Sequence, residues 1–422
     1  MRHARRDMFV IGFALFSMFF GAGNVIFPPY LGLGSGAQWL LGFFCYYMAD
    51  IGLALLALFA ILRSGSPEGI TRPIGAVPSA VLMSAIVLCI GPMLAIPRTA
   101  ATTYEMSLAP LVSGVSQALF SALFFLVILL LCLRESAVVD IVGKVLTPAL
   151  LIGLLVLIVK GVLDPIGPVP ERVLVDNVPR TGIEAGYQTM DVLAAMVFGI
   201  IVLKSARDKG HTAPRDQYRV VAGAGGVAGA ALLVVYLGLT YLGVTTSRFF
   251  DLTVLRTFLM VSIVRSLLGS GGILLFSVVV ALACVTTAVA LVSSAAAYFS
   301  RLSGERVPYW LLTVVICLFS AVVSTFGLEQ IVSIAGPILD LVYPPTLVLI
   351  ALALVRRWIP NDWVYRLAAL GALAFSLLSV LRHWGVDLAF LDALPLASFG
   401  FGWVAPAAVC GALGLLAGRR PA

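Results

Sequence analysis

The chain has 422 residues, of which 61% are hydrophobic and 11% are charged, and its net charge is +7. Soluble domains carry roughly 25% charged residues, so this composition excludes a water-soluble globular protein. Runs of about 20 apolar residues recur along the whole length, which is typical of helices that cross a bilayer. The basic residues fall in short loops between these runs, a pattern of membrane topology that does not favour nucleic-acid binding.

The apolar runs predict an all-α membrane protein of about twelve transmembrane helices in one polytopic domain, residues 1–422. With the N-terminus in the cytoplasm, most of the 27 Lys and Arg residues lie in inside segments, which predicts that both termini are cytoplasmic. The first run follows basic residues, as in a signal peptide, but it shows no usual cleavage site and is interpreted as a helix. The predicted spans are 8–29, 37–62, 78–107, 117–133, 141–163, 185–204, 217–243, 270–299, 308–325, 329–355, 364–381 and 395–417.

The order of these spans suggests a repeat. Residues 8–163 would hold five helices and residues 185–355 five more, while 364–417 would add two. Five is an odd number, so the second half would enter the membrane from the opposite face, which is the geometry of inverted-repeat transporters. The longest polar stretches, 164–184 and 244–269, are too short to be catalytic domains.

The first span carries Gly21-Ala22-Gly23-Asn24, followed by Pro28-Pro29. Unpaired backbone groups in lipid cost several kcal/mol each, so a helix break is tolerated only where it is buried or lines a polar cavity. Such a break offers free N–H groups to a carboxylate and free C=O groups to a cation. The alternative is a helix-packing face made of small residues.

Two later spans carry polar groups that could bind a solute or an ion. Asp191 is an acid between apolar residues, which could pair with an ammonium group or a cation, or could be a solvated acid near the outer interface. Thr286 and Thr287 follow Ala283 at helical spacing, so their oxygens share one face and would suit a monovalent cation. The alternative is that these hydroxyls bond to their own helix.

The third span carries Arg98 and Glu105, which lie seven residues apart and so on one helix face. They could form an ion pair at an outer gate or a purely structural ion pair. Asp50 and Asp340 are the other acids within apolar runs, and the sequence assigns neither a role.

These motifs resemble a known family. Phe19-Phe20-Gly21-Ala22-Gly23-Asn24 with Phe27-Pro28-Pro29, Ile96-Pro97-Arg98-Thr99-Ala100 and Thr189-Met190-Asp191 resemble the bacterial branched-chain amino acid:cation symporters, also called branched-chain amino acid transport system II carriers. The resemblance covers essentially the whole chain. The motif in the first span is fairly specific, whereas the hydroxyls around Thr286 are generic.

The resemblance implies sodium-coupled uptake of leucine, isoleucine and valine through a leucine-transporter-like fold with discontinuous helices 1 and 6. By this likeness the Gly23-Asn24 pair would be unwound, and N–H groups around Ala22 and Gly23 would hold the substrate carboxylate. The implied substrate residues are Gly21, Ala22, Gly23, Asn24, Thr189 and Asp191. The implied sodium residues are Ser17, Phe20, Ala283, Thr286 and Thr287, while Asn24 would help the substrate or a second cation.

The leading hypothesis is therefore a symporter of the bacterial cytoplasmic membrane that uses Na⁺ as coupling ion and needs no cofactor. Proton coupling or another solute remains the alternative. A channel would need a symmetric pore-lining segment, and an enzyme would need clustered catalytic groups; neither pattern occurs in the sequence. The phosphate-binding motif of ATPases is absent, so no ATPase subunit is expected.

Overall fold

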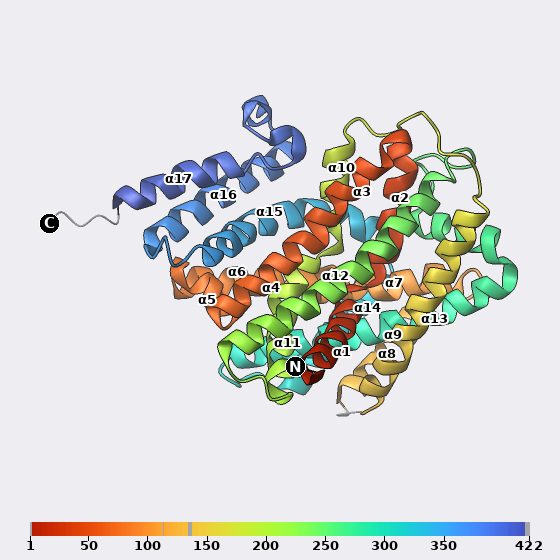
Figure 1. Ribbon diagram of the computed structural model, residues 1–422, viewed down its shortest axis with the longest axis horizontal. Coiled ribbons are helices and arrows are strands. Elements are labelled where there is room, and N and C mark those ends of the chain that lie inside the picture. The colour runs from red at the N-terminus through yellow and green to blue at the C-terminus, as the bar shows by residue number, and fades with distance from the viewer. Residues whose placement is uncertain (1, 113, 134–136, 418–422) are drawn as a thin grey trace.

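The computed structural model describes residues 2–112, 114–133 and 137–417, and within these ranges it contains helices, turns and no strand. The long helices run side by side in one bundle, and α16 and α17 lie together at one flank (Figure 1). The helices are α1 Arg2–Phe19, α2 Ala22–Ser35, α3 Trp39–Tyr47, α4 Leu53–Ser64, α5 Pro67–Thr71, α6 Ala76–Leu88, α7 Ala95–Thr103, α8 Gln117–Leu133, α9 Ala137–Leu163, α10 Val178–Thr189, α11 Asp191–Asp208, α12 Pro214–Val244, α13 Arg256–Leu302, α14 Tyr309–Ser324, α15 Leu328–Leu354, α16 Asp362–His383 and α17 Val404–Ala417.

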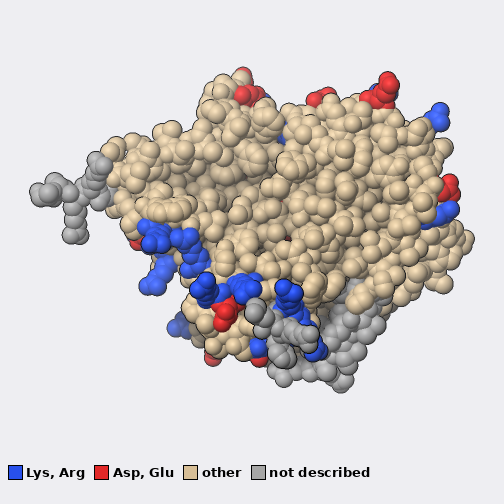
Figure 2. Space-filling model, in the orientation of Figure 1, with Lys and Arg blue, Asp and Glu red and all other residues tan. Residues whose placement is uncertain are grey.

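Every predicted span contains helix, and seven helices of the described residues are long and apolar enough to cross a membrane. Lys and Arg gather mostly along the lower edge of the face in Figure 2, with some Asp and Glu among them, charges of both signs lie along the upper and right edges, and a broad band between the edges carries almost no charge. This distribution is typical of a protein embedded in a bilayer. All six cysteines are free.

The first predicted span is broken, but not where the resemblance placed the break. Phe20 and Gly21 separate α1 from α2, and Gly21 is extended, with φ −103° and ψ −174°. Gly23 and Asn24 lie inside α2, so their expected unwinding is wrong. Pro28 and Pro29 also lie within the helix.

The proline segment of α2 stays helical and packs closely on α12. A Cβ on Gly243 would lie 1.9 Å from the Pro29 carbonyl oxygen, and one on Gly32 would lie 2.0 Å from the Thr240 carbonyl oxygen. Only glycine permits two helix backbones to approach this closely.

The sixth predicted span is broken as well. Met190 separates α10 from α11 and adopts the left-handed conformation, with φ 67° and ψ 17°. A non-glycine residue in this conformation is uncommon and is held by its surroundings. The discontinuity of helices 1 and 6 is therefore present, with Gly21 and Met190 at the two breaks.

The stretch 244–269, which lies between the seventh and eighth predicted spans, is partly helical, because α13 begins at Arg256 and continues across a kink at Gly269, where φ is 65°. Leu259, Met260 and Ile263 are fully buried, so this part of the chain is an amphipathic helix packed on the bundle.

Candidate functional site

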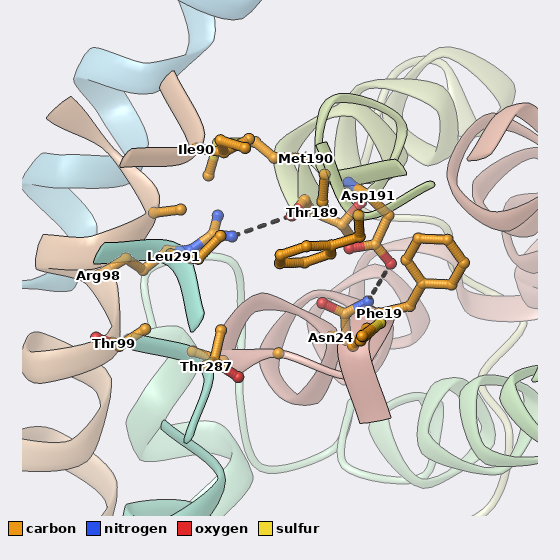
Figure 3. A pocket seen from close by; sticks show the side chains of 16 residues that line it. Phe19, Asn24, Ile90, Arg98, Thr99, Thr189, Met190, Asp191, Thr287 and Leu291 are labelled. Atoms are coloured by element: carbon orange, nitrogen blue, oxygen red, sulfur yellow. Dashed lines mark hydrogen bonds between the residues drawn. The ribbon is translucent and has the colours of Figure 1, made fainter. Parts of the chain in front are cut away.

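A narrow cavity of about 40 Å³ lies at the centre of the bundle, between the two helix breaks (Figure 3). Of the predicted substrate residues, all except Gly23 line this central cavity. Its walls are Met18, Phe19, Gly21, Ala22, Asn24, Ile90, Ala95, Arg98, Thr99, Thr189, Met190, Asp191, Ala194, Phe198, Thr287 and Leu291.

The first turn of α2 supplies backbone donors to the central cavity. No side chain caps this helix start, and both Gly21 and Ala22 line the cavity. The first N–H groups of a helix have no partner within the helix, and the helix dipole adds partial positive charge. The break can therefore bind an anionic group such as a carboxylate.

Asn24 and Asp191 join the two broken helices directly. Asn24 Nδ2 donates to Asp191 Oδ2 at 2.8 Å, the contact drawn in Figure 3, and also donates to the Tyr236 hydroxyl on α12. Asp191 is 4% exposed, which excludes its interpretation as a solvated surface acid. Tyr236 was not identified from the sequence, because a tyrosine in an apolar run carries no distinguishing signal.

Arg98 reaches from α7 to the end of α10, as Figure 3 shows. Its guanidinium donates to the Gln188 carbonyl at 2.5 Å and to the Thr189 carbonyl at 3.2 Å. These carbonyls belong to the last turn of α10 and have no partner in their own helix. Arg98 therefore provides hydrogen-bond donors for the buried Gln188 and Thr189 carbonyls at the second break. The periodicity of the sequence could not reveal this contact.

The predicted ion pair between Arg98 and Glu105 is not formed. Glu105 instead accepts hydrogen bonds from the Thr257 hydroxyl at 2.7 Å and from the Leu328 amide at 2.8 Å. The helix widens into a π-helical turn at Tyr104–Leu108, which shifts Glu105 away from the face expected from α-helical spacing. Glu105 thus links α7 to α13 and α15.

Asp50, left unassigned by the sequence, lies directly behind the central cavity. It is fully buried in a π-helical turn, Met48–Gly52, and its Oδ1 lies 2.7 Å from the Thr189 hydroxyl. Thr189 also lines the cavity. Asp50 therefore supports the second break from outside the cavity wall.

The predicted sodium residues are only partly gathered at the central cavity. Among the described residues Thr287 lines it, whereas Ser17, Phe20, Ala283 and Thr286 do not. The Thr286 hydroxyl donates to the Ala283 carbonyl at 2.9 Å, which is the self-bonding alternative considered for this helix.

A group of charged and aromatic side chains, here called the arginine layer, extends outward from Arg98 in the wall of the central cavity: Phe27, Tyr30, Arg98, Arg256 and Glu329. The Phe27 ring centroid lies 5.8 Å from the Arg98 guanidinium and 5.9 Å from that of Arg256. Arg256 also lies 4.4 Å from the Tyr30 ring and forms an ion pair with Glu329. The layer therefore ties α2, α7, α13 and α15 together.

A larger cavity of about 280 Å³, here called the open cavity, lies on the other side, between α6, α11 and α13. Val87, Met196, Val197 and Ser294 line it, and each is within a few residues of a side chain that lines the central cavity. The open cavity and the central cavity therefore share the helices α6, α11 and α13, or their direct extensions, as walls.

Structures of known transporters share this fold. The chain aligns over 98% of its length with Mhp1, a nucleobase-cation-symport-1 family transporter, covering 93% of it with a TM-score of 0.68 and 14% identity. It also aligns over 97% of its length with MhsT solved with L-phenylalanine, covering 98% of that chain with a TM-score of 0.58 and 16% identity. These proteins have the fold of the leucine transporter.

The family follows from sequence comparison. A carrier protein of branched-chain amino acid transport system 2 from Pseudomonas aeruginosa is 36% identical, with 98% of this chain and 96% of that protein aligned. The branched-chain amino acid permease BraB of Bacillus subtilis is 34% identical over the same shares. The family described as branched-chain amino acid transport protein matches residues 4–420. The chain therefore belongs to the branched-chain amino acid transport protein family.

Proposed function

We propose that the protein is a sodium-coupled symporter that imports leucine, isoleucine and valine by alternating access. The observation that carries the proposal is the presence of two helix breaks, at Gly21 and Met190, in the wall of one central cavity. A broken helix pair presents both free N–H and free C=O groups at mid-membrane, which is how transporters bind charged substrates and ions.

The central cavity offers a partner for each part of an aliphatic amino acid. The substrate carboxylate would accept hydrogen bonds from the N–H groups of Ala22 and Gly23 at the start of α2. The ammonium group would pair with Asp191, the acid that lines the cavity. Both charged ends of the substrate would then be compensated in a low-dielectric site.

The remaining walls would select for the side chain. Ile90, Phe198 and Leu291 form an apolar surface of the central cavity. A pocket of this kind distinguishes aliphatic side chains that differ by one methylene by only about 1–3 kcal/mol. Leucine, isoleucine and valine would therefore compete with one another for uptake.

Sodium would bind where α1 ends beside α13, to carbonyls of Ser17, Phe20 and Ala283 and to the hydroxyls of Thr286 and Thr287. Gly21 and Thr287 already lie close, since a Cβ on Gly21 would be 3.9 Å from the Thr287 methyl carbon. Thr286 can donate its proton to Ala283 and still offer a lone pair to a cation, because a hydroxyl oxygen has two. Oxygen ligands of this kind suit a hard monovalent cation.

We further propose twelve membrane crossings, with an inverted repeat of 8–163 and 185–355, in the cytoplasmic membrane of a bacterium. Both termini would be cytoplasmic, so the arginine layer would face outside and the open cavity inside. Sodium would act by binding one of the two access states more tightly, because a ligand shifts an equilibrium only by its differential affinity. No cofactor and no ATPase subunit enters this mechanism.

Radiolabelled leucine uptake into proteoliposomes, with and without an inward sodium gradient, tests the proposal. Accumulation that requires the sodium gradient and is competed by isoleucine and valine is expected. Accumulation driven by a proton gradient instead would retain the transporter and replace the coupling ion. No accumulation of any of the three amino acids by folded protein under either gradient would refute the proposed function.

A further inference from the structure

Two acids from different helices, Asp50 and Asp191, meet at the second helix break and are here called the carboxyl pair. Asp50 is fully buried in the π-helical turn Met48–Gly52, and Asp191, at the start of α11, is 4% exposed. The Thr189 hydroxyl oxygen lies 2.7 Å from Asp50 Oδ1 and 3.5 Å from the Asp191 amide nitrogen. The two carboxyl groups are also in hydrogen-bonding contact with each other.

A contact between two carboxyl groups requires a proton. An ionised carboxylate only accepts hydrogen bonds, so two such groups bond to each other only when one of them carries an O–H. Two carboxylates at this separation in a low-dielectric site also repel each other strongly, which is why such pairs share one proton. The contact between Asp50 and Asp191 therefore fits a pair with one proton and one negative charge.

The positive charge available to the carboxyl pair is also limited to one. Arg98 is the one Lys or Arg of the described residues in the wall of the central cavity, and it points toward the end of α10 beside Asp191 (Figure 3). Arg98 offsets one carboxylate, and a second buried carboxylate would be left uncompensated at high cost. The other titratable groups that face the pair or Arg98 are phenols and a thiol, which are uncharged at neutral pH: Tyr46, Tyr47, Tyr236, Tyr343 and Cys284.

Asp191 is the member of the carboxyl pair that a solute can reach. It lines the central cavity, whereas Asp50 does not. Two features stabilise Asp191 as a carboxylate once a cation is present: Asn24 donates to its Oδ2 at 2.8 Å, and the first turn of α11 carries partial positive charge. A cation in the cavity therefore supplies the same compensation as the shared proton and makes that proton dispensable.

We infer that the carboxyl pair is a proton-binding site, and that it loses its proton when a substrate ammonium group binds at Asp191. The O–H bond of the pair breaks, the proton passes to water, and the ammonium group replaces it as hydrogen-bond donor and positive charge. Proton and substrate therefore compete, so acidic conditions weaken substrate binding. The choice of an amino acid as substrate rests on the proposed function, whereas the shared proton of the empty protein does not.

Calorimetric titration of the full-length protein with leucine, at saturating sodium, tests this exchange. Heats are compared in two buffers of different ionisation enthalpy, because the buffer takes up any proton that binding releases. We expect about one proton released per leucine bound, and an affinity that rises about tenfold per pH unit where the empty pair holds its proton, within about pH 5 to 8. Binding with no proton release, or with proton uptake, throughout this range would overturn the proposal.

Asp50→Asn shows whether the released proton belongs to the carboxyl pair. The variant removes one acid but keeps a carbonyl oxygen for the Thr189 hydroxyl. Arg98 then balances Asp191 alone, so leucine should bind without proton release and with an affinity nearly independent of pH. Proton release that persists in Asp50→Asn would place the proton elsewhere and overturn the proposal.

Glu105→Gln is the matched control for Asp50→Asn. Glu105 is a half-buried acid that accepts hydrogen bonds from Thr257 and Leu328, but it does not line the central cavity. This variant should release as many protons per leucine as the natural protein. Loss of the release in Glu105→Gln as well as in Asp50→Asn would show that the effect is not specific to the carboxyl pair, and would count against the proposal.

Infrared difference spectra of the natural protein keep the test decisive if Asp50→Asn does not fold. Leucine should remove the carbonyl stretch of a protonated carboxyl group, a band to which zwitterionic leucine itself contributes nothing. A spectrum in which saturating leucine removes no such band would show that the pair keeps its proton or never held one, and would overturn the exchange.

The two proposals fail separately. Sodium-driven leucine uptake, with binding that releases no proton, would refute the proton exchange and leave the symporter. Leucine binding that releases a proton, in protein that accumulates none of the three amino acids, would support the carboxyl pair and refute the proposed transport. Folded protein that neither binds nor accumulates leucine would refute both.

Discussion

The arginine layer and the open cavity lie on opposite sides of the central cavity and differ in how their helices are held together. On the first side Arg98 binds the end of α10, and Arg256 pairs with Glu329 of α15. On the second side Tyr298 of α13 meets Ser84 of α6 at 3.2 Å, and no ion pair of the described residues joins α6, α11 and α13.

This difference bears on the barrier to the proposed change between access states. Charge-assisted hydrogen bonds are roughly twice as strong as neutral ones, and a low-dielectric setting strengthens them. Opening the arginine layer therefore requires a larger compensation than closing the open cavity, whose walls carry Glu68 and Arg301 but are otherwise apolar side chains and hydroxyls. Binding of substrate and cation at the central site is the proposed source of that compensation.

Arg98→Ala should produce the largest effect. It leaves the buried carbonyls of Gln188 and Thr189 without a donor, at about 1.5–3 kcal/mol for each charged hydrogen bond. We expect leucine uptake to fall about 100-fold, measured as initial rate per folded protein. Arg98→Lys should give an intermediate rate of leucine uptake, because lysine keeps the positive charge but lacks the planar guanidinium that can donate to two carbonyls at once. Uptake within threefold of the natural protein in Arg98→Ala would show that this side of the layer is dispensable.

Substitution of the two threonines of α13 should have the next largest effect, and the two variants should differ in the sodium dependence of uptake. Thr287 lines the central cavity, whereas Thr286 also bonds to its own helix. Each variant loses one oxygen ligand of the proposed sodium site. Thr287→Ala should raise the sodium concentration for half-maximal uptake about tenfold. Thr286→Ala should raise it less, because its hydroxyl is shared with the Ala283 carbonyl. Ser294→Ala, on the wall of the open cavity, is the control and should leave the sodium dependence unchanged. Equal sodium dependence in all three variants would remove α13 from the cation site.

Glu329→Gln should have a moderate effect on access. It keeps an acceptor for the Arg256 amide but removes the charge from a partly exposed pair, which is typically worth up to about 1 kcal/mol. A Thr99→Cys reporter in the central cavity should then react about threefold to fivefold faster with an impermeant thiol reagent added outside. Asp164→Asn, which breaks the exposed pair with Lys160, should not change the rate. A rate unaffected by Glu329→Gln would mean that this pair does not hold the layer closed.

Tyr298→Phe should have the smallest effect. It removes a neutral hydroxyl contact between α13 and α6 without changing the ring packing. Leucine uptake is expected to stay within about twofold, since one neutral hydrogen bond contributes roughly 0.5–1.5 kcal/mol at most. A loss as large as that of Arg98→Ala would show that the open cavity is also closed by a polar contact, and the contrast between the two sides would fail.

The sequence by itself determined the class of protein, the helical spans and the two regions where chemistry is concentrated. Apolar runs of sufficient length specify membrane helices for two reasons. The thickness of the bilayer sets the length of a spanning segment, and its apolar core requires apolar side chains and internally hydrogen-bonded backbone groups. Gly21, Asn24 and Asp191 were recognisable as candidate site residues, because a polar or flexible residue inside such a run costs free energy and so points to a function. The family resemblance added discontinuity of the sixth helix, where the structure places Met190.

Only the tertiary structure decided which groups meet. Arg98 binds carbonyls 90 and 91 residues away, and Asp50 contacts a hydroxyl 139 residues away, so helical periodicity could not pair them. Local π-helical turns moved Glu105 off the face that α-helical spacing predicts, and close packing on Gly243 kept Pro29 within a helix. These outcomes depend on contacts between distant segments, and a sequence pattern records only the spacing of near neighbours along one helix.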